Sequence, residues 1–127
     1  MTLGALGLPC DGPELCRRLK AGLNRLFADP STIGDLFSED YVQTVNGEVT
    51  DRTQYRAYLE KSLTLFPLSS FEVPEAAWQG DTVAARFLSR KTAPDGKIRL
   101  GEAMLFGEVR DGRFTRVHEI TRVVSAD

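Results

Sequence analysis

Two stretches in the first half of the chain carry the apolar periodicity of amphipathic helices. In residues 13–27 the apolar side chains fall on one stripe, and the arginines and the lysine lie elsewhere. A second helix is predicted to begin at a capping box, formed by Asp51 and by Gln54 three residues later, and to run through Leu65. Pro67 ends it. The predicted inward stripe of this second helix consists of Tyr55, Leu59, Leu63 and Phe66.

The segment between the two helices reads as a short helical turn followed by a hairpin. Residues 31–37 are long enough for only one or two helical turns. Residues 39–50 then alternate as a strand, a turn and a short strand. Asn46-Gly47 is a strong signal for a two-residue hairpin turn. We therefore expect the first two strands of a sheet in this segment.

From Ser69 onward the alternation of apolar and polar residues has the period of two that is typical of strands. Four strands are predicted, over residues 70–78, 82–91, 97–109 and 113–124. Helices that come first and a run of antiparallel strands that follows favour an α+β fold, with the helices covering one face of a curved, mostly antiparallel sheet. We expect a single domain over residues 1–127, with residues 1–12 as an N-terminal extension.

Turn lengths assign the residues of the last three strands to the two faces of the sheet. If Asp111-Gly112 is a two-residue turn, Glu119 faces Met104 across the hairpin. If residues 93–96 form a four-residue loop, Phe87 faces Glu102. One face, which we expect to lie under the helices, then holds Val83, Ala85, Phe87, Leu100, Glu102, Met104, Phe106, Val117, Glu119 and Thr121. The opposite face mixes arginines with apolar residues and carries His118.

Glu102 and Glu119 are the residues of that inner face that carry chemistry. In this register they are diagonal neighbours, with backbones roughly 7–8 Å apart. Two carboxylates in a poorly hydrated cavity push their pKa values apart, which leaves one protonated as an acid and the other ionised as a base. A bulge, or one residue more in either loop, would instead turn a glutamate to the outside. Glu102 would then be an ion pair that fixes strand register, and Glu119 an exposed residue paired with an arginine.

Composition and charge exclude several classes of function. The net charge of −2 and the pI near 5.5 give no electrostatic attraction to nucleic acid or to an anionic membrane. Cys10 and Cys16 do not have zinc-site spacing, and His118 is the single histidine, so we expect no metal and no disulfide. The apolar stretch at the N-terminus is too short to span a bilayer, and a cytoplasmic location is the default expectation.

The order of these segments resembles a known family. The N-terminal helix, the stretches DLFSEDYVQTVNG and GDTVAARF, the capped helix and the stretch VRDGRFTRVHEIT resemble the SnoaL-like branch of the nuclear transport factor 2-like superfamily over residues 13–125. The resemblance implies a cone-shaped fold, in which a bent sheet wraps helices around a deep apolar pocket. It also implies a homodimer that forms through the outer face of the sheet. Family members include polyketide cyclases, ketosteroid isomerase, limonene-epoxide hydrolase and non-catalytic binding domains.

The family motifs are only partly present. Some members have Gln-His in the first strand, where this chain has Gln43-Thr44. A frequent His-Trp-Asp of the last strand corresponds to Val117-His118-Glu119, so the acid is kept and the histidine is replaced. The Asp-Arg-Asp arrangement of the epoxide-hydrolysing relatives has no match. The general-base Asp of the isomerase has no match between Tyr41 and Gly47.

Two functions agree with these residues. The first is a cofactor-independent enzyme of isomerase, cyclase or hydratase type that acts on an apolar small molecule bearing a carbonyl or hydroxyl group, with Glu119 and Glu102 as catalytic residues. The alternative is a non-catalytic module for small-ligand binding or dimerisation, which the missing histidines favour. The residues expected to contact the ligand are Tyr41, Gln43, Phe87, Met104, Phe106 and Trp78.

Overall fold

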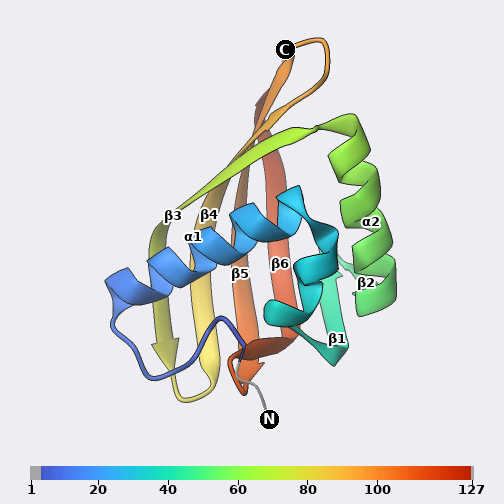
Figure 1. Ribbon diagram of the computed structural model, residues 1–127. Coiled ribbons are helices and arrows are strands. Elements are labelled where there is room, and N and C mark those ends of the chain that lie inside the picture. Colours follow the sequence, from blue (N-terminus) through green and yellow to red (C-terminus); the bar gives the residue numbers. More distant parts are fainter. Residues whose placement is uncertain (1–3, 127) are drawn as a thin grey trace.

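The computed structural model describes residues 4–126. Within them the chain forms two α-helices, a short 3-10 helix and one sheet of six strands (Figure 1). The helical elements are α1 (Gly12–Ala28), η1 (Pro30–Asp35) and α2 (Arg52–Leu65). The strands are β1 (Phe37–Val45), β2 (Glu48–Asp51), β3 (Leu68–Gln79), β4 (Thr82–Thr92), β5 (Ile98–Arg110) and β6 (Arg113–Ala126).

The sheet has the strand order β2-β1-β6-β5-β4-β3. All neighbouring strands are antiparallel except β1 and β6, which pair in parallel. The sheet is strongly twisted and curved, α1 lies across one of its faces, and α2 stands beside the end that β1 and β2 form (Figure 1). The predicted α+β architecture, with helices covering one face of a curved sheet, is confirmed.

Helix α1 forms where the apolar periodicity predicts it. Asp11 caps its N-terminus, because the Asp11 carboxylate accepts a hydrogen bond of 2.7 Å from the backbone N–H of Glu14. The predicted stripe is buried against the sheet, and its members are Leu15, Leu19, Leu23, Leu26 and Phe27. Burial of this stripe, at roughly 1.5–3 kcal/mol per large apolar side chain, fixes α1 on the sheet.

Helix α2 opens with the predicted capping box. The backbone N–H of Gln54 donates to the Asp51 carboxylate at 2.8 Å, and the backbone N–H of Asp51 donates to the Gln54 side chain at 2.9 Å. Leu59 is fully buried, whereas Tyr55 is only half-buried. The stripe of α2 is therefore less completely covered than that of α1.

The predicted hairpin turns are present. Asn46 and Gly47 have φ values of 50° and 86°, and Asp111 and Gly112 have φ values of 55° and 76°. Positive φ at both central residues matches the twist of two-residue hairpins. Arg110 pairs with Arg113 across the second turn, as predicted.

The predicted register of β5 is wrong by one residue on both sides. A bulge in β6 leaves Thr115 unpaired between Phe114, which pairs with Val109, and Arg116. On the other side the loop holds five residues, 93–97, because Thr92 pairs with Ile98. A slip of one residue moves every side chain of a strand to the other face. Ala103 and Leu105 are consequently buried, and the outer face of β5 carries Leu100, Glu102, Met104 and Phe106.

The described part of the predicted N-terminal extension packs onto the domain. The backbone N–H groups of Gly4 and Leu6 donate to the carbonyls of Asp111 and Gly112, each at 2.8 Å. Leu6 is fully buried in the core. Residues 1–3 and residue 127 of the predicted domain lie outside the described residues. Among residues 4–126 no helix is long and apolar enough to cross a membrane.

Candidate functional site

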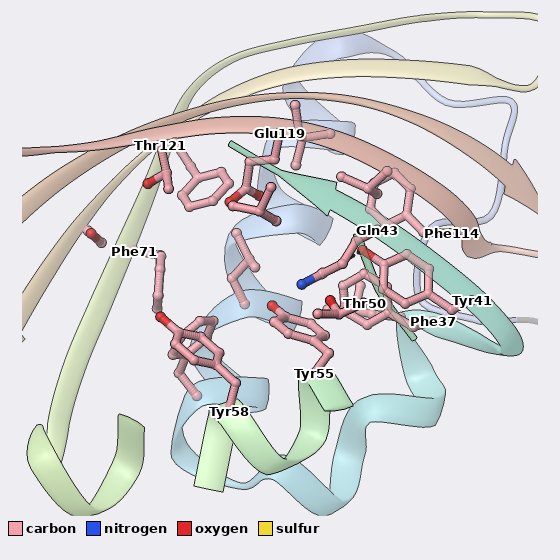
Figure 2. Close-up of a pocket in the computed structure, with 18 of the residues that line it drawn as sticks. Phe37, Tyr41, Gln43, Thr50, Tyr55, Tyr58, Phe71, Phe114, Glu119 and Thr121 are labelled. Carbon is pink, nitrogen blue, oxygen red and sulfur yellow. Dashed lines mark hydrogen bonds between the residues drawn. The ribbon is translucent and has the colours of Figure 1, made fainter. Parts of the chain in front are cut away.

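The concave face of the sheet and the two α-helices enclose a cavity of about 530 Å³ (Figure 2). Its volume lies within the range of ligand-binding sites. Its lining comes from both α-helices and from all six strands, and most of it is apolar or aromatic. Aromatic rings line it from several elements, namely Phe27, Phe37, Phe71, Phe87 and Phe114.

Glu119 is an acidic residue among these apolar side chains. It lies on β6 with Val117 and Thr121, and all three residues line the cavity because they alternate toward the same face. Among the described residues no hydrogen bond or ion pair reaches the Glu119 carboxyl group. Burial raises the pKa of Glu119 to about 7, and the charge of Lys91 opposes this rise only in part. At neutral pH both protonation states of Glu119 are populated.

Tyr41 and Gln43 contribute a polar pair from β1. Tyr41 is 1% exposed, and its hydroxyl donates a hydrogen bond of 2.9 Å to Oε1 of Gln43. Burial raises the pKa of Tyr41 far above its ordinary value, so the hydroxyl remains a donor. Because Oε1 is engaged, the amide nitrogen of Gln43 points into the cavity (Figure 2). It has two N–H groups to offer to an oxygen atom there.

The parallel pairing of β1 with β6 brings Gln43 and Glu119 together. Val45 is paired with Glu119, and Gln43 with Val117. Gln43 is therefore displaced from Glu119 by two residues along neighbouring strands, roughly 7 Å, on the same face of the sheet. A small molecule in the cavity can contact the amide and the carboxyl group at the same time.

The comparison with protein families identifies the fold family. Residues 17–117 match the model of the SnoaL-like domain. The chain belongs to the SnoaL-like domain family. The match runs from α1 into β6, so the resemblance inferred from the sequence is confirmed.

Several solved structures are similar to this SnoaL-like domain. IdmH, a candidate polyketide cyclase from Streptomyces antibioticus, is 25% identical, with a TM-score of 0.68 over 80% of this chain and 87% of that one. AclR, a candidate hydroxylase from Streptomyces galilaeus, is 22% identical, with a TM-score of 0.72 over 87% of this chain and 74% of that one. A candidate SnoaL-like polyketide cyclase from Jannaschia sp. CCS1 is 15% identical, with a TM-score of 0.63 over 80% and 83%. No curated protein sequence matches the chain significantly.

Glu102 of the SnoaL-like domain does not line the cavity, so its predicted position beside Glu119 is wrong. It lies on the outer face of β5, where Nε of Arg86 donates to Oε2 at 2.8 Å and Nε of Arg122 donates to Oε1 at 2.9 Å. The hydrogen bond from Arg86, followed by that from Arg122, holds the pKa of Glu102 below its usual range. Glu102 thus forms the ion pair that was the alternative interpretation of the sequence. The residue opposite Glu119 on β5 is Leu105, so the two glutamates do not act as a pair.

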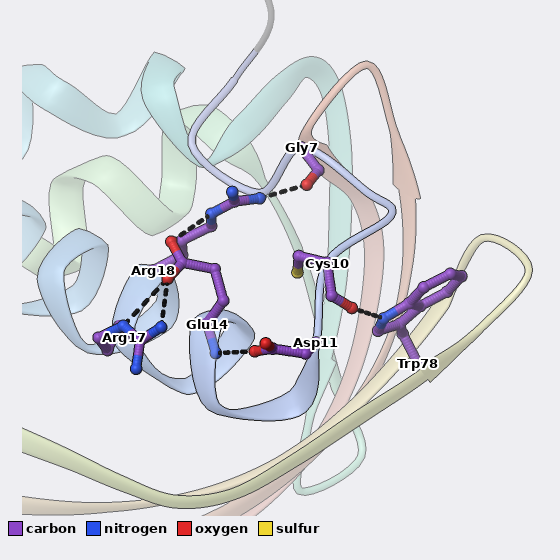
Figure 3. A network of polar contacts seen from close by, with 7 residues as sticks. All are labelled: Gly7, Cys10, Asp11, Glu14, Arg17, Arg18 and Trp78. Atoms are coloured by element: carbon purple, nitrogen blue, oxygen red, sulfur yellow. Dashed lines mark hydrogen bonds and ion pairs between the residues drawn. The ribbon is translucent and has the colours of Figure 1, made fainter.

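Three of the residues expected to contact a ligand lie elsewhere. Met104 and Phe106 are 58% and 62% exposed on the outer face, because the register of β5 differs from the predicted one. Trp78 lies outside the cavity lining, and its Nε1 donates a hydrogen bond of 2.6 Å to the carbonyl of Cys10 (Figure 3). Phe87 lines the cavity together with Tyr41 and Gln43.

Three further residues of the cavity lining were not among those expected to contact a ligand, although Tyr55 belongs to the predicted inward stripe of α2. Tyr55 and Tyr58 of α2 line the cavity on the side opposite Glu119 (Figure 2). Burial raises the pKa of the Tyr55 phenol well above its ordinary value, which keeps it protonated. Lys91 lies on the inner face of β4, two strand periods beyond Phe87, and that period-two spacing is the signal by which it could have been found.

The polar lining of the SnoaL-like domain has no arrangement suited to a metal ion. Within residues 4–126 no three His, Cys, Asp or Glu side chains are close enough together to hold one. The polar side chains that line the cavity are the carboxyl groups of Glu119 and Glu48, together with amides, hydroxyls, phenols and the ammonium group of Lys91.

Proposed function

We propose that this protein is a cofactor-independent acid–base enzyme that acts on an apolar small molecule bearing a carbonyl or hydroxyl group. The observation that carries the proposal is the carboxyl group of Glu119, which lines an apolar cavity and has a pKa raised by burial to about 7. A group whose pKa lies near the working pH accepts and returns protons efficiently. Glu119 is therefore the proton-transferring residue.

The amide of Gln43 is the group that binds the substrate oxygen. Its N–H groups face the cavity, because Oε1 accepts the hydrogen bond from Tyr41. A donor fixed before the reaction stabilises negative charge that develops on a carbonyl oxygen, and it does so strongly in an apolar cavity. Tyr41 is a positioning residue, since it acts on the substrate through Gln43.

The simplest reaction of these groups is proton transfer next to a carbonyl. The ionised Glu119 carboxylate removes a proton from the carbon beside the carbonyl, the electron pair of the broken C–H bond forms a C=C bond, and the π pair of the carbonyl moves onto the oxygen. Gln43 donates a hydrogen bond to the resulting enolate. The protonated Glu119 then returns its proton to carbon, at the same position or at a conjugated one, which leaves the enzyme unchanged.

Deuterium incorporation into a model ketone tests this function without knowledge of the natural substrate. 2-Tetralone, an apolar ketone with exchangeable protons beside the carbonyl, is incubated with the protein in D₂O and followed by mass spectrometry. The wild type is expected to accelerate exchange, and Glu119→Gln is expected to keep its affinity for the ketone but to lose at least about 100-fold in exchange rate. Glu102→Gln is the matched control, and we expect it to catalyse exchange at the wild-type rate. An undiminished rate in Glu119→Gln would refute the proposal.

A non-catalytic binding module is the second candidate function. It is favoured by the isolation of Glu119, whose carboxyl group forms no hydrogen bond or ion pair with residues 4–126. A binding module would take up 2-tetralone without catalysing exchange. The same experiment therefore distinguishes the two functions.

We further propose that two copies of the chain associate through the outer face of the sheet. Four large apolar side chains of neighbouring strands are 37–73% exposed there, namely Leu88, Met104, Phe106 and Ile120. An exposed apolar patch of this kind, bordered by charged groups such as Arg86 and Glu102, is typical of a protein–protein contact.

A further inference from the structure

We propose that Lys91 binds a carboxylate group of the ligand, so that the ligand is an apolar molecule with a carboxylate at one end. The proposal rests on the proposed function in one respect, namely that the cavity is where the ligand binds. It adds that the cavity has a subsite for a charged group, that the ligand is negatively charged, and that the ligand binds with its carboxylate at Lys91.

Lys91 is the second-last residue of β4, and it lines the cavity. Phe87, Ser89 and Lys91 alternate on the inner face of this strand, and all three line the cavity. Lys91 is half-buried there, beside a ring of α1, a ring of α2 and the ring of Phe66, which caps the C-terminus of α2.

Aromatic rings surround the ammonium group without engaging its hydrogens in conventional hydrogen bonds. Nζ of Lys91 lies 5.1 Å from the ring centre of Phe27, 5.8 Å from that of Tyr58 and 6.0 Å from that of Phe66. These distances are within the range of cation–π attraction. Among residues 4–126 no oxygen accepts a hydrogen bond from Nζ. An ammonium group has three N–H donors, and they remain available to a ligand.

A second cation lies next to Lys91, on the neighbouring strand and on the same face of the sheet. Arg99 of β5 is its partner in the ladder, and the guanidinium carbon of Arg99 lies 5.0 Å from the ring centre of Phe66. Both cations thus flank the same ring. Like charges directly opposite one another on neighbouring strands are destabilising. No described carboxylate forms an ion pair with either of them, so an anion bound at Lys91 would relieve this repulsion.

The form of the subsite favours a carboxylate over a phosphate. Lys91 is the single cation among the described residues that line the cavity, because Arg99 lies outside the lining. Phosphate sites in proteins combine several donors, such as a guanidinium fork or a row of backbone N–H groups. One ammonium group matches a singly charged carboxylate. Binding there places the rest of the ligand along the cavity, with its reactive carbonyl near Gln43 and Glu119.

A pair of probes of the same size and shape measures the contribution of this charge. Naphthalene-2-carboxylate and naphthalene-2-carboxamide have nearly the same shape but differ in charge, with two N–H donors in the amide alone, and calorimetry gives the affinity of each for the full-length protein. We expect the wild type to prefer the carboxylate by about tenfold. Lys91→Met should lose this preference through weaker carboxylate binding, with the affinity for the carboxamide unchanged. Lys91→Arg should retain it.

Arg90→Met is the matched control, since Arg90 is the neighbouring cation of β4 and is exposed on the opposite face. It removes the same charge and should leave both affinities as they are. Unchanged carboxamide binding in Lys91→Met also shows that this variant is folded. Equal affinity of the wild type for the two probes, no binding of the carboxylate, or a preference that survives in Lys91→Met would overturn the proposal. Any of these results would leave the role of Glu119 intact, because that role is measured separately by deuterium exchange.

Discussion

The hydroxyl of Tyr41 donates a hydrogen bond of 2.9 Å to the side-chain oxygen of Gln43, two residues further along β1. Tyr41 is buried, and its burial keeps the phenol protonated, so the hydroxyl has a proton to donate to Oε1 of Gln43. The amide of Gln43 therefore presents its nitrogen, and not its oxygen, to the cavity. The site offers a hydrogen-bond donor at one position and an acid of neutral pKa at another, which is the requirement for polarising a carbonyl and moving a proton beside it.

Tyr41→Phe removes the group that orients Gln43. We expect the rate of 2-tetralone exchange to fall by roughly tenfold while the affinity for the ketone changes little, because the ring remains and the donor loses its fixed direction. The free energy of unfolding should fall by about 1 kcal/mol with the loss of one buried hydrogen bond. Exchange kinetics and urea unfolding measure the two effects. A rate equal to that of the wild type would mean that Tyr41 has no part in orienting Gln43.

The pKa of Glu119 makes the stability of the protein depend on pH. The folded state raises this pKa from 4.5 to about 7, so the folded protein binds the proton more tightly than the unfolded chain does. The contribution of Glu119 to stability therefore decreases as the pH rises from about 4.5 to 7 and is constant above that. A shift of this size corresponds to roughly 3 kcal/mol.

Glu119→Gln should abolish that dependence. Urea unfolding of the variant and of the wild type at a series of pH values gives the difference between their free energies of unfolding. We expect the difference to grow in favour of the variant between pH 4.5 and 7 and then to level off. A difference that is the same at every pH would show that the folded and unfolded states have the same Glu119 pKa.

Glu102→Gln tests the assignment of the two glutamates to opposite faces of the sheet. Because Glu102 lies on the outer face between Arg86 and Arg122, its neutralisation should leave deuterium exchange and probe affinity unchanged. It should lower stability slightly, and less so in high salt, since the lost ion pairs are accessible to solvent. A large loss of exchange in this variant would contradict the register that turns Glu102 away from the cavity.

Phe106→Glu tests the proposed association of two chains. Phe106 is 62% exposed within the apolar patch of the outer face, and a charge there would oppose its burial between two copies. We expect the wild type to sediment as a dimer at tens of micromolar and the variant as a monomer. Leu65→Glu is the control, because Leu65 is 52% exposed at the end of α2 and does not belong to the sheet. A monomeric wild type would refute the dimer.

Local signals in the sequence account for most of the fold. The helical stripe of residues 13–27, the capping box at Asp51 and the turns at Asn46-Gly47 and Asp111-Gly112 each depend on nearby residues, and the structure contains all of them. Such features are predictable because the groups that stabilise them are close together in the chain.

The faces of β5 were not predictable from its sequence, because both of its faces are apolar. Ala103 and Leu105 alternate with Met104 and Phe106, so the pattern does not decide which pair is buried. The bulge at Thr115 and the fifth residue of the preceding loop decide it, and no local signal marks either of them. In β6 the alternation is clearer, because Val117 is buried, His118 is exposed and Glu119 lines the cavity.

The place of Lys91 depends on contacts between distant segments. Near the end of a strand, a lysine is usually solvated, and the period-two spacing from Phe87 indicates its face of β4 but not the rings that surround it. The rings that surround it belong to α1, to α2 and to the C-cap of α2, 25 or more residues away along the chain. Only the packing of both helices on the sheet brings these rings to Lys91.

The most direct test of the account is the titration of Glu119 by NMR. Carbon-13 labelling of the glutamate side chains, with Glu119→Gln to assign the resonance, gives the pKa of this one carboxyl group in the folded protein. The expected midpoint is about pH 7, with a midpoint below the ordinary value for Glu102 as the internal comparison. A midpoint near pH 4.5 for Glu119 would mean that its carboxyl group is in contact with water, and the proposed acid–base chemistry would have no basis.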